Sequence, residues 1–234
     1  MRLRGHGIYE YVAGFQSNMF GRHWKFSRAL YRRAAVDLPM TMRAWLSGCG
    51  RTSIDLCQTL EDSATGDLLA SGVCRVVNVD PRTQRSIPLP ERLRDTLRMG
   101  VDDGQTRGER FPIIQPPAAV PDRSFSCRMT VRHDDMDFLF HTTQGAYLFF
   151  ARECAAQAAK AGFYFQFSDD IAFHLASETT GVHFAESFAG DELKVSTWED
   201  SNCPLLLHFT VSKDGNIIYY ATVHYFDDDT TVTA

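Results

Sequence analysis

Apolar and polar residues alternate with a period of two along residues 40–46, and this alternation predicts a β-strand. Residues 53–60 form a second strand-like run. A turn rich in Gly, Asp and Ser at residues 62–67 then leads to the largely apolar residues 68–79. Strand-like runs joined by short polar turns are typical of antiparallel hairpins. This part of the chain is therefore expected to form an antiparallel meander.

The same pattern occurs a second time, because residues 31–80 have a degenerate copy at residues 184–229. Aligning Trp45 with Trp198 brings three strand-like runs of the copy into register, at residues 193–199, 205–211 and 217–226. The repeat is too long for a solenoid, whose units span roughly 20–50 residues. It predicts a domain that is duplicated within one chain.

Between the two copies, residues 81–122 contain seven of the nine prolines of the chain. Proline lacks a backbone N–H group and resists both a helix interior and a central strand. The sequence therefore predicts a first unit at residues 1–80, a proline-rich linker at residues 81–122 and a second unit at residues 123–234. A short helix at residues 91–98 is expected to interrupt the linker.

The second unit begins with a strand-like segment at residues 125–132 and a helical segment at residues 144–161. The helical segment is rich in Ala and Leu, free of Pro and followed by Gly162. Thr142 or Thr143 can cap this helix, because a hydroxyl accepts a hydrogen bond from an otherwise unpaired N–H group of the first turn. Glycine directly after the last turn commonly ends a helix.

The first unit has no room for an equivalent strand and helix before Tyr31. We expect residues 4–14 to be the tail of such a helix and the first unit to be truncated at its N-terminus. A motif-like run at residues 18–23 lies too close to Tyr31 to open a full helix. In the second unit, residues 163–180 are expected to be irregular.

Composition excludes several classes of protein. The chain has a net charge of −5 and no basic stripe, which disfavours a nucleic-acid partner. Its six cysteines include no C-x-x-C pair and no His neighbour at ligand spacing, so all six are assigned to packing. The sequence contains no glycine-rich strand-to-helix loop and no His-Glu-x-x-His, so no metal and no cofactor is expected.

The sequence also bears on location and assembly. It has no apolar run near the roughly 20 residues that span a bilayer, and residues 1–9 lack the apolar core of a secretory signal. A soluble cytoplasmic location is favoured, while Arg2 and Arg4 without a neighbouring acid leave mitochondrial or other organelle import open. An exposed sheet edge in the shortened first unit predicts self-association as a homodimer.

Candidate chemistry is concentrated immediately before the helix of the second unit. Asp135 and Asp137 lie two residues apart, His141 follows Asp137 by four residues, and Tyr147 lies on the helix. Asp137 would lie just before the helix N-terminus, whose positive end and free N–H groups can polarise a carbonyl. A carboxylate at that point can attack the carbonyl carbon or activate a water molecule.

These residues resemble the signature of the tandem (double) hotdog-fold acyl-thioesterase superfamily. They are similar to 4-hydroxybenzoyl-CoA thioesterase-like and acyl-ACP thioesterase-like proteins. Residues 190–193, Gly-Asp-Glu-Leu, are similar to a turn common in the same family. The resemblance covers residues 25–80 and 123–228. It implies an α+β double hotdog with two antiparallel sheets, each packed on a central helix.

The resemblance implies hydrolysis of an acyl thioester carried on coenzyme A or on an acyl carrier protein. It assigns Asp137 and His141 to catalysis. It also assigns four residues to substrate binding, with the N–H near Gln144 polarising the carbonyl: Gln144, Gly145, Tyr147 and Phe140. One site is expected, in the second unit, because no Asp-x-Asp-x-x-x-His run occurs in the first.

The same residues allow other interpretations. Asp137 can be a structural acid of the strand-to-helix turn, and a capping or core role for His141 is favoured over that of a general base. Leu139 and Phe140 stand where the family has Asn and Gly, which favours a non-catalytic acyl-binding or scaffold protein. A hydratase or dehydratase of the same fold is disfavoured, because its pattern places His five residues after Asp with Asn-Pro between them. Fold alone does not separate these activities.

Overall fold

A computed structural model of the chain describes residues 17–32, 39–80, 82–83, 85–102, 109–137, 140–167 and 171–227. The chain divides into two compact units, Met1–Pro112 and Ile113–Ala234. The strands of each unit pair in antiparallel fashion, which confirms the predicted α+β class. The proline-rich segment predicted as a linker is split between the units, because its residues up to Pro112 belong to the first.

The first unit contains the three strands that the sequence predicts and one that it does not. The predicted strands are β2 (Met40–Cys49), β3 (Ser53–Asp62) and β4 (Leu68–Asn78). The additional strand, β1 (Ser17–Phe26), pairs with β4 and is followed by the short helix α2 (Arg28–Tyr31), giving the order β2-β3-β4-β1. The motif-like run at residues 18–23 is therefore a strand, whose register shifts between Met19 and Gly21.

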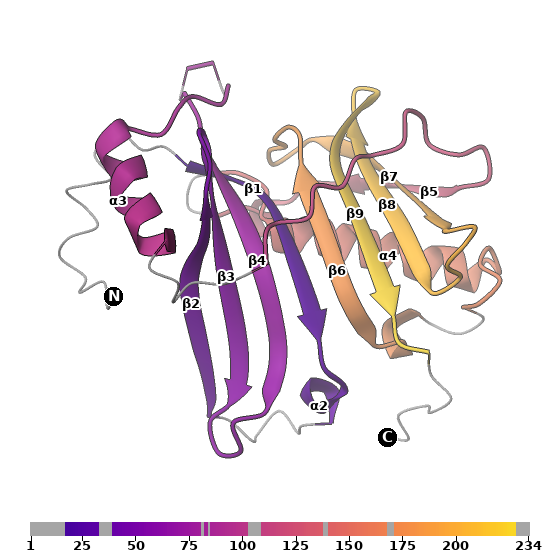
Figure 1. The fold of residues 1–234 in the computed structure, drawn as a ribbon. Helices are drawn as coiled ribbons and strands as arrows, with labels where there is room; N and C mark the ends of the chain where they lie inside the picture. The colour runs from indigo at the N-terminus through magenta and orange to yellow at the C-terminus, as the bar shows by residue number, and fades with distance from the viewer. Residues whose placement is uncertain are drawn as a thin grey trace. The chain divides into compact units, whose positions relative to one another are not determined.

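The helix predicted inside the proline-rich segment is present and longer than expected. Helix α3 (Glu91–Asp102) packs against β2, as Figure 1 shows. Its approach is fixed by two hydrogen bonds: the Leu89 N–H donates to the Arg51 carbonyl over 2.8 Å, and the Asn78 side chain donates to the Pro88 carbonyl over 2.9 Å. The prolines of this segment that the structure describes lie outside α3 and outside every strand.

One face of the first sheet is crossed by the last residues of the unit. Asp55, 2% exposed, accepts two hydrogen bonds from Arg75 over 2.7 and 2.8 Å. Arg110 lies 3.8 Å from the same carboxylate, and the Arg75 guanidinium lies over the Phe111 ring. A buried carboxylate requires such partners, because burying an unpaired charge is costly. The Asp55–Arg75 pair therefore helps to hold residues 109–112 on this face.

The second unit contains five antiparallel strands with a long helix on one face (Figure 1). Its strand order is β6-β9-β8-β7-β5. The elements are β5 (Phe125–Thr130), the 3-10 turn η1 (His133–Asp135), α4 (Gln144–Lys160), the 3-10 turn η2 (Ile171–Phe173), β6 (Ala176–His183), β7 (Glu192–Glu199), β8 (Leu206–Lys213) and β9 (Asn216–Tyr225). The stretch predicted as irregular through residue 180 ends earlier, because β6 begins at Ala176.

Helix α4 forms the centre of the second unit's core. Its buried face consists mainly of alanine and cysteine with two aromatic residues, Tyr147 and Phe150. Small side chains let the helix approach the sheet closely, where Leu193, Val195 and other apolar strand residues pack against it. The predicted caps are both present: the Thr143 hydroxyl accepts from the Ala146 N–H, and Gly162 follows the helix with φ of 65°.

The pairing of strands supports the predicted duplication. In the first unit β4 lies between β3 and β1, and in the second unit β9 lies between β8 and β6. Trp45 pairs with Cys57 on the neighbouring strand, as Trp198 pairs with His208. The described residues of the first unit contain no counterpart of β5 or α4. The helix tail predicted at residues 4–14 lies outside the described residues.

Within the described residues, no helix combines the length and hydropathy needed to cross a membrane.

Candidate functional site

The predicted site lies in the connection between β5 and α4. Val131, 2% exposed, continues β5 by donating its N–H to the Asp191 carbonyl and accepting from the Gly190 N–H, at 3.0 and 2.9 Å. The Gly-Asp-Glu-Leu turn thus holds the first residue of the connection by backbone hydrogen bonds. Gly190 in this turn has a φ of 90°, a conformation that favours glycine. The 3-10 turn η1 follows, closed by a hydrogen bond of 2.7 Å from the Arg132 N–H to the Asp135 carboxylate.

Asp137 and His141 are joined by a compact backbone loop. The Asp137 N–H donates to the His141 carbonyl over 2.9 Å, and the His141 N–H donates to the Asp137 carboxylate over 3.2 Å. The Phe140 N–H also donates to the Asp137 carbonyl, over 3.0 Å. Asp137 is half-buried. The two residues that the sequence assigns to catalysis therefore lie together, and the carboxylate also shapes the loop, as its structural interpretation requires.

The chain between His141 and α4 is anchored to the segment that follows β6. Thr142 is buried, and its hydroxyl donates to the Ser187 carbonyl over 2.7 Å. The hydroxyls of Thr142 and Tyr147 lie 2.8 and 2.7 Å from the Ser187 hydroxyl. Tyr147 is 1% exposed, and burial raises the pKa of its phenol although the Ser187 hydrogen bond opposes the shift. Tyr147 thus holds Ser187 from within the core and offers almost no surface to a substrate.

His141 has a carboxylate partner that the sequence did not single out. Its Nε2 lies 3.6 Å from Glu186 Oε2, and both side chains are 29% exposed. The His141 ring also contacts the Phe188 ring edge-on, with 5.9 Å between the centroids. A carboxylate beside an imidazole orients the ring. Near the start of α4, the Asp137 carboxylate thus binds the His141 backbone, while Glu186 lies beside the His141 ring.

Gln144 and Gly145 form the first turn of α4. By helix geometry their N–H groups have no acceptor inside the helix, while Thr143 takes the N–H of Ala146 over 3.1 Å. The positive end of the helix macrodipole is located at the same turn. This arrangement provides the donors that the sequence predicts for a carbonyl oxygen. The Gln144 side-chain oxygen is buried and has no hydrogen-bond partner among the described residues.

Phe140 occupies the position at which the resembling family has glycine, and its backbone has the conformation that glycine favours. Its φ is 63°, in the left-handed region that side chains seldom adopt. Its ring is 72% exposed, so it projects outward. The neighbouring Leu139, which stands at the family's Asn position, lies outside the described residues.

Sequence reasoning missed Glu186 and Ser187, because the sequence contains no local signal for them. Both are polar residues in the short connection between β6 and the Gly190 turn. The pattern there resembles an ordinary polar loop, and the partners of Glu186 and Ser187 lie about 45 residues earlier in the chain. Only the tertiary fold brings the two segments together.

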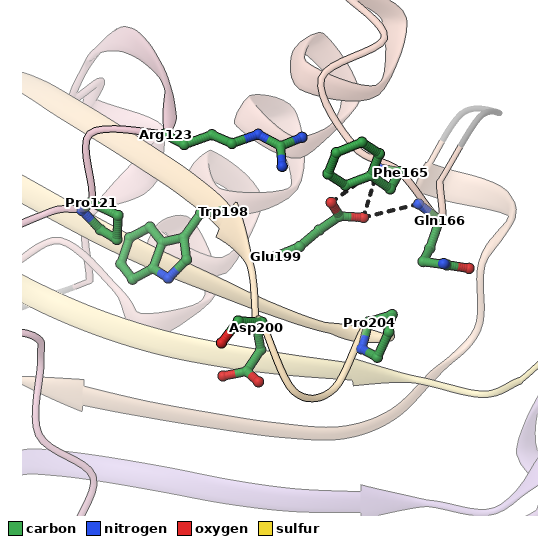
Figure 2. A pocket seen from close by; sticks show the side chains of 9 residues that line it. Pro121, Arg123, Phe165, Gln166, Trp198, Glu199, Asp200 and Pro204 are labelled. Atoms are coloured by element: carbon green, nitrogen blue, oxygen red, sulfur yellow. Dashed lines mark hydrogen bonds between the residues drawn. The ribbon is translucent and has the colours of Figure 1, made fainter.

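A cavity of about 640 Å³ lies elsewhere in the second unit (Figure 2). The Glu199 carboxylate accepts from the Phe165 and Gln166 N–H groups over 2.9 and 3.0 Å, and the Arg123 guanidinium lies 3.9 Å from the centre of the Phe165 ring. Trp198 forms another part of its wall. None of the residues that line the cavity belongs to the predicted site, and its charged groups are engaged with the protein itself.

Next to this cavity, the sheet face opposite α4 carries a polar and aromatic stack. His208 lies parallel to Trp198 on one side and to Tyr220 on the other. Its Nε2 lies 3.0 Å from the Asp200 carboxylate and its Nδ1 lies 2.8 Å from the Tyr220 hydroxyl. The hydrogen bond with His208 lowers the pKa of Asp200. Among the described residues, no group of three or more His, Cys, Asp or Glu side chains could hold a metal ion.

The arrangement of the second unit, a long helix packed on a curved antiparallel sheet, defines the hotdog fold. Comparison with solved structures confirms that resemblance for the fold of the chain. An acyl-ACP thioesterase from Bacteroides thetaiotaomicron matches with a TM-score of 0.64 at 16% identity, covering 95% of this chain and 82% of that one. The 12:0-ACP thioesterase from Umbellularia californica matches with a TM-score of 0.65 at 15% identity, covering 95% and 79%.

A MaoC-like dehydratase from Phytophthora capsici has a similar fold, with a TM-score of 0.53 at 14% identity, covering 91% of this chain and 72% of that one. The sequence matches no protein-family model and no curated protein. Because the same fold supports both thioesterases and a dehydratase, activity has to be argued from the residues of the site.

Proposed function

We propose that this protein hydrolyses an acyl thioester carried on coenzyme A or on an acyl carrier protein. The observation that carries the proposal is the place of Asp137, whose loop ends at the N-terminus of α4. The fold supports it, because two of the similar structures are acyl-ACP thioesterases. The chain's own residues supply what the reaction needs: a carboxylate, a second acid–base pair and a set of N–H donors.

In the proposed mechanism the thioester carbonyl oxygen accepts hydrogen bonds from the N–H groups of Gln144 and Gly145. The helix macrodipole at this turn stabilises the negative charge that develops on that oxygen. Asp137 then either attacks the carbonyl carbon, which releases the thiolate and leaves an acyl anhydride, or takes a proton from an attacking water. The His141–Glu186 pair provides a group that can donate a proton to the departing thiolate.

The first test is a panel of acyl-CoA and acyl-ACP thioesters of graded chain length, with release of free thiol as the readout. Hydrolysis is expected in the wild type and should fall at least about a hundredfold in Asp137→Asn, which is the usual contribution of a positioned acid or base. Asp134→Asn is the matched control, because Asp134 is an exposed acid three residues away. Equal turnover in wild type and Asp137→Asn would refute the assigned role.

A second measurement separates the two roles of the carboxylate. A single turnover in water enriched in oxygen-18 labels Asp137 itself if an anhydride forms and is hydrolysed at the aspartyl carbon, whereas direct attack by water labels only the released acid. Glu186→Gln tests the paired imidazole. It is expected to lower turnover about tenfold or more, because the His141 ring loses the carboxylate that orients it.

A non-catalytic acyl-binding or scaffold protein is the second candidate. The observation that favours it is Phe140, whose exposed ring and left-handed backbone occupy the family's glycine position beside His141. Saturable binding of acyl-CoA without release of thiol in the wild type would support this candidate over the hydrolase. A Phe140→Gly variant that gains turnover would show that this residue limits catalysis.

A further inference from the structure

Two cysteines of the second unit converge on a single residue of β7. Cys127 lies on β5, is half-buried and is the register partner of Val195. Cys154 lies on α4, is 0% exposed and points its thiol at the Val195 carbonyl, with 3.5 Å between sulfur and oxygen. Helix α4 packs over both β5 and β7. The two thiols therefore meet at the same point beneath the helix.

The two thiols differ in their surroundings. The neighbouring Cys127 thiol and burial raise the pKa of Cys154, whereas the Cys154 thiol lowers the pKa of Cys127. Cys127 therefore has the greater thiolate character. Cys127 is also the more accessible of the two. Thiolate character and access are what make a cysteine react with oxidants.

We propose that Cys127 and Cys154 are a modification site that a peroxide converts into an intramolecular disulfide. The Cys127 thiolate attacks one oxygen of hydrogen peroxide, breaking the O–O bond and forming a sulfenic acid, and the released hydroxide takes a proton to become water. The Cys154 sulfur, losing its proton, then attacks the Cys127 sulfur and displaces the hydroxyl group as a second water. Two thiols are oxidised by two electrons, and one peroxide is reduced to two waters.

The bond would enclose the segment that builds the candidate site. The chain between Cys127 and Cys154 contains η1, the Asp137–His141 loop and the first turns of α4. A covalent link across this segment restricts the unfolded chain more than the folded one and so stabilises the fold. Because β5 is an edge strand that pairs with β7 among the described strands, the disulfide would also tie this edge strand to the helix.

The test uses the full chain, fully reduced and then exposed to hydrogen peroxide, with remaining thiols alkylated before digestion with trypsin. The expected product is a cross-link between the peptides Ser124–Arg128 and Glu153–Lys160, which the Arg and Lys positions of the sequence define. Oxidised protein should have a Tm about 5 °C or more above reduced protein, and dithiothreitol should reverse the change. Both readouts are independent of substrate, so they stand apart from the proposed hydrolysis.

Matched variants make the outcome decisive. Cys127→Ser and Cys154→Ala should lose the cross-link and the rise in Tm, and Cys127→Ser, at a half-buried position, keeps the test valid if Cys154→Ala is poorly folded. Cys203→Ser should keep both, because Cys203 lies in the Asp200–Leu206 turn. The proposal is overturned if Cys203 of the wild type becomes oxidised while Cys127 and Cys154 remain alkylatable. It is also overturned if Cys127 proceeds to sulfinic acid without a cross-link.

Discussion

The two units share one order of strands but differ in what surrounds their sheets. β2-β3-β4-β1 of the first unit corresponds to β7-β8-β9-β6 of the second. The second unit adds β5 and α4, and its helix buries a large apolar cluster. The described part of the first unit has no such helix. Among the described residues, both units contain the shared strands, whereas the candidate site lies in the β5–α4 connection of the second unit.

The two units also differ in how each binds a carboxylate. In the first unit a buried carboxylate is bound by arginine, through the pair of Asp55 and Arg75. In the second unit, the stack of Trp198, His208 and Tyr220 includes a carboxylate, Asp200, that is more exposed and bound by an imidazole. A buried ion pair that loses one partner is costly, whereas a partly exposed pair contributes little. Substitutions in the two units should therefore have effects of very different size.

The largest expected effect is that of Asp55→Asn in the first unit. Removing this charge leaves the Arg75 guanidinium, only 18% exposed, without its anion, so the free energy of unfolding should fall by about 3–5 kcal/mol. Glu61→Gln is the matched control, because Glu61 is on the same strand and pairs with Arg43, which is 65% exposed. It should cost less than about 1 kcal/mol. Urea unfolding measures both, and equal losses would contradict the assigned burial.

A second pair of substitutions compares equivalent core positions. Leu56 and Leu207 occupy equivalent positions when Trp45 is aligned with Trp198. Each is the register partner of the residue that follows the tryptophan of its own unit. Leu207 is 0% exposed beneath α4, and Leu56 is half-buried. Leu207→Ala should therefore destabilise the protein by about 2–5 kcal/mol. Leu56→Ala should cost about 1–2 kcal/mol, since less apolar area is lost from the folded state.

Denaturation followed by tryptophan fluorescence and by circular dichroism measures this difference. If Leu56→Ala proves as damaging as Leu207→Ala, the first unit has a core as demanding as the second, and the comparison between them fails.

The elements that the sequence predicted are those with an uninterrupted pattern. β2 and β7 alternate regularly, and α4 has both a capping threonine and a terminating glycine, so local chemistry was sufficient. The missed strands, β1 and β6, lack the regular alternation of apolar and polar residues on which strand prediction depends.

The candidate site, like the fold, was predictable only where its residues are close together in the sequence. Asp137, His141 and the first turn of α4 are neighbours in sequence, so their spacing indicated a common location. Glu186 was not predictable, because its contact with His141 depends on how the end of β6 meets the start of the helix. The contact between Cys127 and Cys154 was missed for the same reason, since the sequence assigned every cysteine to packing.

A smaller effect is expected at the cap of α4, the element that the first unit lacks among its described residues. Thr143→Ala removes the acceptor of the Ala146 N–H and should cost about 1 kcal/mol, while Thr143→Ser should retain most of the stability. Thermal unfolding compares the two variants. If the proposed function holds, Thr143→Ala should also lower turnover, because the helix start positions the N–H donors. A loss of equal size in Thr143→Ser would show that the methyl group, not the hydroxyl, matters.

The smallest expected effect concerns Asp200 and its dependence on pH. The hydrogen bond with His208 lowers the pKa of Asp200 below its ordinary value of 3.8. A carboxyl group whose pKa is lowered by folding adds stability above its unfolded pKa and loses it as the pH falls through the folded value. Asp200→Asn should therefore reduce stability by up to about 1 kcal/mol at pH 7. The difference from wild type should begin to shrink as the pH falls through 3.8 and should vanish below the lowered pKa of the folded state.

Urea unfolding of both proteins from pH 7 to pH 3 measures this difference, with Asp122→Asn as the control for the loss of one exposed negative charge in the same unit. A difference that stays constant down to pH 3 would mean that the Asp200 charge is not what stabilises the stack. In that event packing alone would hold the stack of Trp198, His208 and Tyr220. The comparison of one paired carboxylate in each unit would then fail. A difference that disappears in the acidic range, with the control unchanged, would instead show that a paired carboxylate stabilises each unit. Its contribution would be large in the first unit and small in the second.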